Sequence, residues 1–190
     1  MPLNIPNLLT WGRILLIPLF VGVFYFPHDW LNPHEQNLLA TIIFVAAALT
    51  DWLDGYLARV LKQTTAFGAF LDPVADKLMV AAALIMLVQL DRTDTIVAFI
   101  IIGREITISA LREWMAKIGA ARSVAVSFLG KVKTTSQMIA IPMLLYHDPL
   151  FPFFNPQEVG TWLIYVAALL TLWSMGYYLR MAWPHIAERV

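Results

Sequence analysis

Apolar residues along this chain of 190 residues gather into six long stretches, which short polar or proline-containing segments separate. Stretches of this kind with few charged residues are typical of helices embedded in a membrane. The pattern therefore predicts an all-α integral membrane protein with six transmembrane helices, and we treat residues 1–190 as a single membrane domain. The expected spans are 11–26, 36–61, 66–90, 95–115, 134–146 (extended by part of 124–130) and 159–182.

The residues that lead into the first span mix polar and apolar side chains. We expect a short amphipathic N-terminal segment whose apolar side lies on the membrane surface. The apolar set is Leu8, Leu9, Trp11 and Ile14, and the polar set is Asn7, Thr10 and Arg13.

Composition narrows the possible chemistry. Hydrophobic residues make up 59% of the chain, which exceeds the usual fraction in soluble domains. The charges of the 13 basic and 13 acidic residues cancel, so the net charge identifies no class of partner. We expect no nucleic acid among the binding partners. Cysteine is absent, which excludes disulfides, thiolate metal sites and cysteine nucleophiles.

Lysine and arginine are distributed unevenly over the loops. The loops 27–36, 90–95 and 147–158 contain one basic residue between them, Arg92. The positive-inside rule places the other loops, both chain termini and the segment 51–76 in the cytoplasm. The basic residues expected on that side are Arg59, Lys62, Lys117, Arg122, Lys131, Lys133 and Arg189.

Four aspartates follow one another closely where the second expected helix ends and the third begins. In the second helix, Asp51 and Asp54 are spaced so that they share one face with Gly55 and Ala58. The two small residues leave a groove with carboxylate oxygens at its rim. Arg59, one turn after Gly55, offers a positive group for a phosphate.

The third expected helix has a matching face. Gly68, Asp72 and Asp76 are spaced four residues apart, and the short linker makes the two helices antiparallel neighbours. We therefore expect the two acidic faces to meet in a polar cavity that opens to the cytoplasm. Pro73 leaves two possibilities open: Asp72 caps a helix that begins there, or the helix continues without one backbone hydrogen bond.

Four carboxylates cannot share a cavity as bare anions, so protons or divalent cations must compensate their charge. Hard oxygen ligands without a nearby histidine or cysteine favour Mg²⁺ or Mn²⁺ over zinc. Such ions complete their coordination with water and substrate phosphates. The alternatives are a structural role and a pathway for cations or protons, because acidic residues in membrane spans also mark those.

The pattern D-x2-D-G-x2-A-R-x8-G-x3-D-x3-D resembles the signature of the CDP-alcohol phosphatidyltransferase family at all eight positions. The resemblance implies transfer of a phosphatidyl group from CDP-diacylglycerol, or of a phosphoalcohol from a CDP-alcohol, with CMP leaving. It also implies two divalent ions per site, a homodimer and a location in the bacterial inner membrane. The eight positions are Asp51, Asp54, Gly55, Ala58, Arg59, Gly68, Asp72 and Asp76.

The resemblance also implies roles for these residues. Asp51, Asp54 and Asp72 would hold the metal ions, while Asp76 would contact them and deprotonate the acceptor hydroxyl as the catalytic base. The cytidine diphosphate group would contact Asp54, Gly55, Ala58, Arg59 and Gly68.

Three further segments resemble the branch of this family that makes phosphatidylglycerol phosphate: N-I-P-N-L-L-T-W-G-R at 4–13, G-R-E at 103–105, and G-K-V-K-T at 130–134 with Gln137. They imply CDP-diacylglycerol as donor and sn-glycerol 3-phosphate as acceptor, with membrane lipids as surroundings. The candidates for binding the acceptor phosphate are Asn7, Thr10, Arg104, Arg112, Lys131 and Lys133.

Other interpretations stay open at this point. Arg104 is also compatible with an internal ion pair to Glu105, and Arg112 with a side chain that reaches to the membrane surface. Inositol phosphate, serine and a cardiolipin-forming reaction are alternative acceptor chemistries within the family. A membrane prenyltransferase would be a different class, although such enzymes have longer chains and two acidic motifs far apart. A cation transporter would be another class, which does not need the groove made by Gly55, Ala58 and Arg59 and usually shows a repeat.

Overall fold

The computed structural model describes residues 5–61, 65–120, 128–149 and 154–187, and this part of the chain folds into six helices. The expected all-helical architecture is confirmed. The helices are α1 (Ile5–Val23), α2 (Pro33–Val60), α3 (Ala66–Gln89), α4 (Thr95–Lys117), α5 (Phe128–Tyr146) and α6 (Pro156–Ala187).

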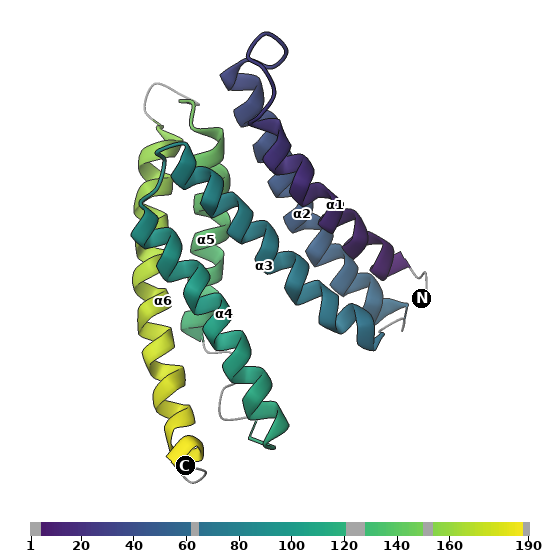
Figure 1. Cartoon of the computed structure of the whole chain (residues 1–190), viewed down its shortest axis with the longest axis vertical. Coiled ribbons are helices and arrows are strands. Elements are labelled where there is room, and N and C mark those ends of the chain that lie inside the picture. The colour runs from purple at the N-terminus through teal and green to yellow at the C-terminus, as the bar shows by residue number, and fades with distance from the viewer. Residues whose placement is uncertain (1–4, 62–64, 121–127, 150–153, 188–190) are drawn as a thin grey trace.

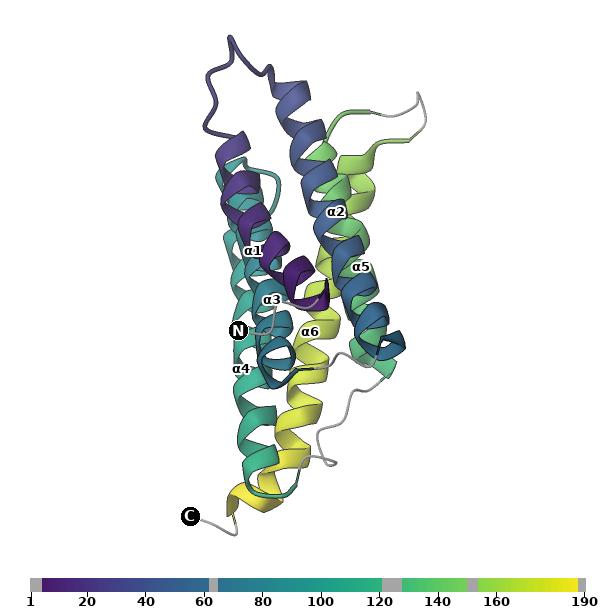
Figure 2. The same ribbon diagram turned by 90° about the vertical axis from the view of Figure 1, so that its right-hand side faces the viewer.

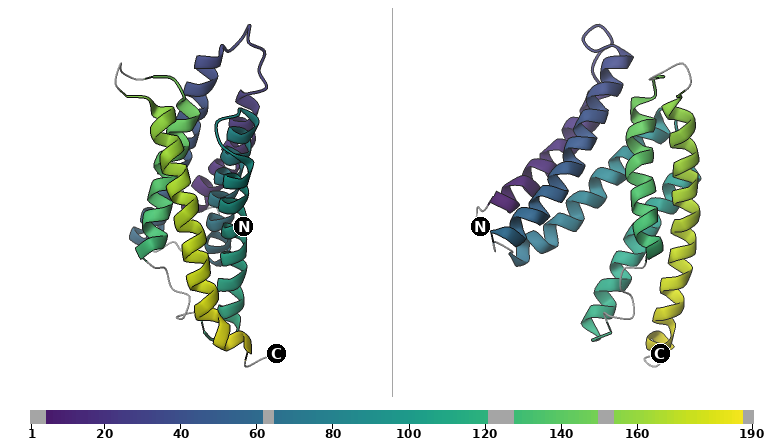
Figure 3. Two further views of the ribbon diagram at one scale, coloured as in Figure 1. Left: turned by 90° about the vertical axis from the view of Figure 1, so that its left-hand side faces the viewer. Right: turned by 180° about the vertical axis from the view of Figure 1, so that it is seen from behind.

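The helices form an elongated bundle with two groups at its sides (Figure 1). On one side α1 packs against α2 and α3, and on the other α6 packs against α5 and α4. Contacts of α3 with α4 and of α2 with α5 join the two groups. In Figure 2 α2 lies in front of α5, and Figure 3 shows α5 and α6 running antiparallel along each other.

A large apolar core holds the bundle together, and a second, smaller cluster lies between α4 and α6. The large core draws large side chains from several helices, among them Phe20 of α1, Phe44 of α2, Leu84 of α3 and Leu144 of α5, all of which are buried. Many large apolar side chains also point outward, and those that are most exposed include Phe99 and Trp162. An apolar outer surface is expected of a bundle whose solvent is lipid.

Two helices are long and apolar enough to cross a membrane by length and composition among the described residues, Pro33–Ala58 and Pro156–Pro184. Asn7–Val23 is a shorter apolar helix. The structure thus gives six helices with two clear candidate spans, and the remaining expected spans stay predictions.

The N-terminal amphipathic segment is not separate from the first span, which corrects our expectation. α1 runs without interruption from Ile5 to Val23, and Pro18 lies inside it. Its polar residues are spaced three apart and therefore share one face. That face turns into the protein, where Asn7, Thr10 and Arg13 are buried, while Leu8 on the opposite face is 63% exposed.

α3 continues through Pro73, which decides between the two possibilities left open by the sequence. The helix already has its N-cap one residue before it starts, because the hydroxyl of Thr65 accepts a hydrogen bond from the amide of Gly68 (2.9 Å). Pro73 then removes only the hydrogen bond to the carbonyl of Ala69. Asp72 is consequently an internal residue of α3 rather than a cap.

The expected short connection between α2 and α3 is confirmed, and the two helices are antiparallel (Figure 1). α1 begins, α2 ends and α3 begins toward the same end of the bundle, which we call the aspartate end because α2 and α3 bring Asp51 and Asp72 there. α6 also ends on that side. The predicted basic residues Lys62, Arg122 and Arg189 lie outside the described residues.

Arg92 ties three elements together at the opposite end. Its guanidinium group donates to the carbonyl oxygens of Leu144 (3.2 Å) and Leu145 (2.7 Å) at the end of α5. It also donates to the side-chain oxygen of Asn37 near the start of α2 (2.7 Å). The loop between α3 and α4 is thereby fixed to two other helices.

Candidate active site

Arg13 occupies the centre of the aspartate pair on α2. Its guanidinium group donates to Asp51 (2.6 Å) and to Asp54, so that one cation bridges the two carboxylates. Arg13 and Asp54 are almost completely buried, whereas Asp51 is 42% exposed. A buried carboxylate needs such a partner, because an unpaired charge in the interior is strongly unfavourable.

The N-terminal helix also contacts the aspartate on α3. The hydroxyl of Thr10 donates to Asp72 (2.6 Å), so α1 lies against both acidic faces. The carboxylates of Asp51 and Asp72 are close enough to Asp54 to repel it electrostatically. The expected meeting of the α2 and α3 acidic faces is therefore present, with α1 supplying polar partners to both.

Gly68 of α3 lies directly against Asn7 of α1. A Cβ atom at this position would be 2.6 Å from the side-chain oxygen of Asn7, and the hydroxyl of Thr65 donates to that same oxygen (3.2 Å). Any larger residue would push Asn7 away. The family resemblance implies that Gly68 contacts the cytidine diphosphate group, and in this structure its immediate neighbours include Asn7.

Asp76 lies between two small cavities. One of about 10 Å³ also contacts Arg13 and Met138, and another of about 70 Å³ also contacts Glu105 and Lys133. Asp76 therefore shares one cavity with Arg13 and the other with Glu105 and Lys133.

A buried ionic cluster forms the far wall of the larger cavity. Lys133 of α5 donates to the carboxylate of Glu105 in α4, and Arg104 donates to the same carboxylate (3.2 Å). Arg104 also donates to the hydroxyl of Ser174 in α6 (3.1 Å). Two cations thus share one carboxylate, which leaves this cluster with a net positive charge.

The structure separates the candidates for the acceptor phosphate. Arg104 and Lys133 lie together, whereas Asn7 and Thr10 contact the start and the aspartate face of α3. Arg112 stacks on the ring of Tyr178, 5.1 Å from its centre, and donates to its hydroxyl (3.2 Å). The side chains of Arg59 and Lys131 lie outside the described residues, while Gly55 and Ala58 are partly buried on α2.

The donor set suits a hard divalent cation chemically, because two neighbouring helices offer four aspartate carboxylates and neither histidine nor cysteine belongs to the set. Among the described residues, however, no three such groups are arranged as they would be around a metal ion. Arg13 takes two of the carboxylates, so its guanidinium group holds the place expected for a cation. The residues fit a metal ion chemically, and Arg13 competes with it for the same oxygens.

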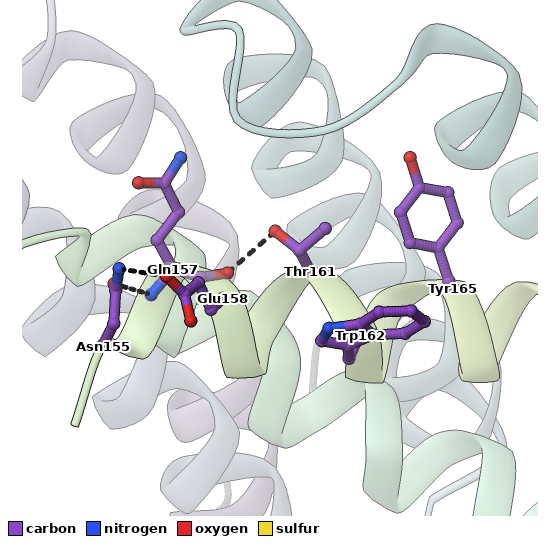
Figure 4. Close-up of a pocket in the computed structure, with 6 residues that line it drawn as sticks. All are labelled: Asn155, Gln157, Glu158, Thr161, Trp162 and Tyr165. Atoms are coloured by element: carbon purple, nitrogen blue, oxygen red, sulfur yellow. Dashed lines mark hydrogen bonds between the residues drawn. The ribbon is translucent and has the colours of Figure 1, made fainter. Parts of the chain in front are cut away.

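A further cavity lies elsewhere and does not carry this chemistry. It measures about 530 Å³ and lies against the start of α6, where Asn155, Gln157, Thr161 and Trp162 line it (Figure 4). Its polar groups bond to one another, as when Thr161 donates to the carbonyl of Gln157 (2.8 Å). No aspartate of the signature contacts it.

Three residues at the site were not assigned from the sequence. Arg13 was part of the amphipathic segment and of the resembling segment 4–13. Glu105 was part of a possible ion pair and of the resembling segment 103–105, and Gln137 was named only with the segment 130–134. The spacing of Asn7, Thr10 and Arg13 on one helical face was the available signal for Arg13. The partners themselves are 38 and 41 residues away in the chain, so only the packing of α1 reveals them.

The chain belongs to the CDP-alcohol phosphatidyltransferase family, whose sequence profile matches residues 3–173. Its similarity to individual proteins extends over the full length. It is 53% identical over 190 residues to CDP-diacylglycerol–glycerol-3-phosphate 3-phosphatidyltransferase of Pectobacterium atrosepticum, covering 99% of this chain and 100% of that protein. The proteins of the same name from Yersinia enterocolitica (99% and 100% covered) and Pseudomonas fluorescens (97% and 92% covered) are 52% and 51% identical.

Proposed function

We propose that this protein transfers the phosphatidyl group of CDP-diacylglycerol to sn-glycerol 3-phosphate, giving phosphatidylglycerol phosphate and CMP. The similarity to transferases named for that reaction covers both chains nearly completely, which supports the donor and the acceptor together. The observation that carries the proposal is that Asp76 and the buried Lys133 line one cavity. An acceptor that is a phosphorylated alcohol needs a base to take the proton of its hydroxyl group and a cation to bind its phosphate.

The reaction forms a bond between the acceptor hydroxyl oxygen and the phosphorus of the lipid phosphate, and the bond from that phosphorus to CMP breaks. Asp76 accepts the proton of the hydroxyl as the bond forms. Lys133 and Arg104 bind the acceptor phosphate and hold its hydroxyl near Asp76. In the free protein Glu105 supplies the negative charge that these two cations need, and the bound acceptor phosphate takes over part of that role.

Asp51, Asp54 and Asp72 would hold magnesium or manganese, with Asp76 beside them. When bound, such ions neutralise the negative charge of the donor diphosphate and of the leaving phosphate. Gly55, Ala58 and Arg59 remain proposed contacts of the cytidine diphosphate group. Binding of metal at Asp51 and Asp54 requires Arg13 to release at least one of the two carboxylates.

The proposed setting is the bacterial inner membrane, with six spans and the aspartate end in the cytoplasm. Because the chain has no cysteine, a single introduced cysteine can be labelled without background. A Thr93→Cys protein in intact cells should react with a membrane-impermeant maleimide. A Lys117→Cys protein should react only after the membrane is opened, and the reverse pattern would contradict this orientation.

The reaction is tested by measuring CMP release from CDP-diacylglycerol and Mg²⁺ with purified protein. Release that depends on glycerol 3-phosphate is the expected result. Release with serine or inositol phosphate instead would keep the family chemistry and reject this acceptor. Absence of CMP with every acceptor would reject the proposal, and a parallel assay for pyrophosphate would detect prenyl transfer.

We also propose a homodimer, on the family resemblance alone. The mass of the purified protein in detergent, measured by light scattering with the detergent subtracted, tests it. A monomer that retains full activity would contradict it.

A further inference from the structure

Gln137 is a buried polar residue that the reaction described above does not use. It lies on α5, four residues after Lys133 and therefore on the same helical face, about 6 Å farther along the axis. Its side chain is 4% exposed. It lines the cavity of about 70 Å³ together with Asp76, Glu105 and Lys133.

The side-chain oxygen of Gln137 has no hydrogen-bond partner among the described residues. An unpartnered acceptor in the interior costs free energy, so native proteins rarely retain one without a ligand or water to satisfy it. Here the oxygen belongs to a residue that lines a cavity, and the cavity is large enough for more than one water molecule. The oxygen itself is buried, so a rotation of the amide group would be needed to present it to a hydroxyl group that enters the cavity.

The arrangement of the cavity matches an alcohol that carries two hydroxyl groups and a phosphate. Lys133 attracts the phosphate, Asp76 takes the proton of the reacting hydroxyl, and Gln137 presents a neutral acceptor. In sn-glycerol 3-phosphate the primary hydroxyl reacts, and the secondary hydroxyl is left for a neutral partner. A neutral amide suits it better than a second carboxylate, which would repel the phosphate.

We propose that Gln137 accepts a hydrogen bond from the secondary hydroxyl of the acceptor and thereby selects glycerol 3-phosphate over phosphorylated alcohols that lack this group. This role of Gln137 adds a source of acceptor specificity to the proposed function and depends on that function. A site built to bond a hydroxyl rejects the analogue without it, because its own polar group then stays unpaired.

The test compares glycerol 3-phosphate with 3-hydroxypropyl phosphate, which has the same length and reacting hydroxyl but no secondary hydroxyl. The wild-type protein should prefer glycerol 3-phosphate by at least about tenfold in kcat/KM. Gln137→Met, which is similar in volume but offers no amide, should reduce this preference to about twofold or less. Gln157→Met makes the same chemical change at the far end of the bundle and should keep the wild-type preference.

A purely structural role of Gln137 would lower activity with both acceptors equally and leave their ratio unchanged, which would overturn the assignment. Equal use of the two acceptors by the wild-type protein would also overturn it, and this measurement does not require the variant to fold. Failure of the wild-type protein to release CMP with either acceptor would overturn the proposed function, and this assignment with it.

Discussion

Arg13 and Asp54 form an ion pair in which both side chains are almost completely buried, at 1% and 3% exposure. The two residues come from different helices, α1 and α2, and Asp51 shares the same guanidinium group. The pair therefore joins α1 to the helix that carries half of the family signature. It also balances charge that the signature concentrates in the interior.

Arg13→Met should destabilise the protein by about 3–5 kcal/mol, because it keeps the apolar stem of the side chain and leaves Asp54 buried without its counter-charge. Thermal unfolding in detergent, followed by circular dichroism, measures this loss. Arg180→Met removes an exposed arginine on α6 and should have little effect. Equal stability of the two variants would show that the Arg13 pair does not hold the helices together.

Magnesium should stabilise the Arg13→Met protein more than the wild-type protein. In the variant the carboxylates of Asp51 and Asp54 are available, whereas in the wild-type protein the ion must displace Arg13. The unfolding temperature is measured over a series of MgCl₂ concentrations, with NaCl at matched ionic strength as the control. A larger response of the wild-type protein would mean that Arg13 and the ion do not share a site.

Asp76→Asn should lower kcat by about 10²–10⁴-fold, because an amide cannot accept the proton of the acceptor hydroxyl. The KM for glycerol 3-phosphate should change much less, since Lys133 and Arg104 remain. Asp29→Asn makes the same change in an exposed loop and should retain wild-type kinetics. A rise in KM with unchanged kcat would assign Asp76 to binding rather than to proton transfer.

Lys133→Met should raise the KM for glycerol 3-phosphate by about 10–100-fold, which corresponds to the loss of a hydrogen bond to a charged group. The KM for CDP-diacylglycerol should stay near its wild-type value. The control is Lys117→Met, since Lys117 pairs with Glu113 on the surface, where both residues are 70% exposed. Parallel increases of both KM values would indicate a general distortion of the site.

His147 makes stability depend on pH at the end of the bundle opposite the aspartates. Burial lowers the pKa of its imidazole below the usual 6.5, and the positive charge of Arg92 lowers it further. The unfolded chain therefore binds a proton more readily, so the stabilising contribution is complete above pH 6.5 and decreases as the pH falls below that value.

The wild-type protein should consequently lose more thermal stability between pH 7.5 and pH 5.5 than His147→Asn does. Asparagine is a suitable replacement because His147 has φ 64°, a conformation that asparagine tolerates. Unfolding temperatures of the two proteins at both pH values provide the comparison. Identical pH dependence would assign the effect to other groups.

The order and number of helices were predictable from the sequence, because apolar stretches and polar loops alternate clearly. The ends of the helices were less predictable. For example, α6 starts three residues before the expected residue 159 and continues past Pro184. The continuation of α3 through Pro73 depended on Thr65, whose capping role became visible only in three dimensions. Local pattern fixes where helices form, whereas caps and packing fix where they stop.

The site was predictable only in part. Regular spacing placed Asp51 with Asp54 and Asp72 with Asp76, since these pairs lie within single helices. The link between Lys133 and Glu105 spans 28 residues and joins two helices, α4 and α5, so no local pattern indicates it. Arg112 and Lys133 were both candidates for the acceptor phosphate, and the fold separates them: Arg112 contacts Tyr178, whereas Lys133 pairs with Glu105 and lines the cavity with Asp76.

The contacts of Arg92 give the bundle a fixed point at the end away from the aspartates. α3 leaves this point and extends over 24 residues, or about 36 Å, to the aspartate end. A change of about 5° in the tilt of a helix of that length displaces its far end by about 3 Å. The length of α3 therefore amplifies a small change of tilt that begins at Arg92. A substitution of Arg92 would change the spacing of the signature carboxylates although it contacts none of them.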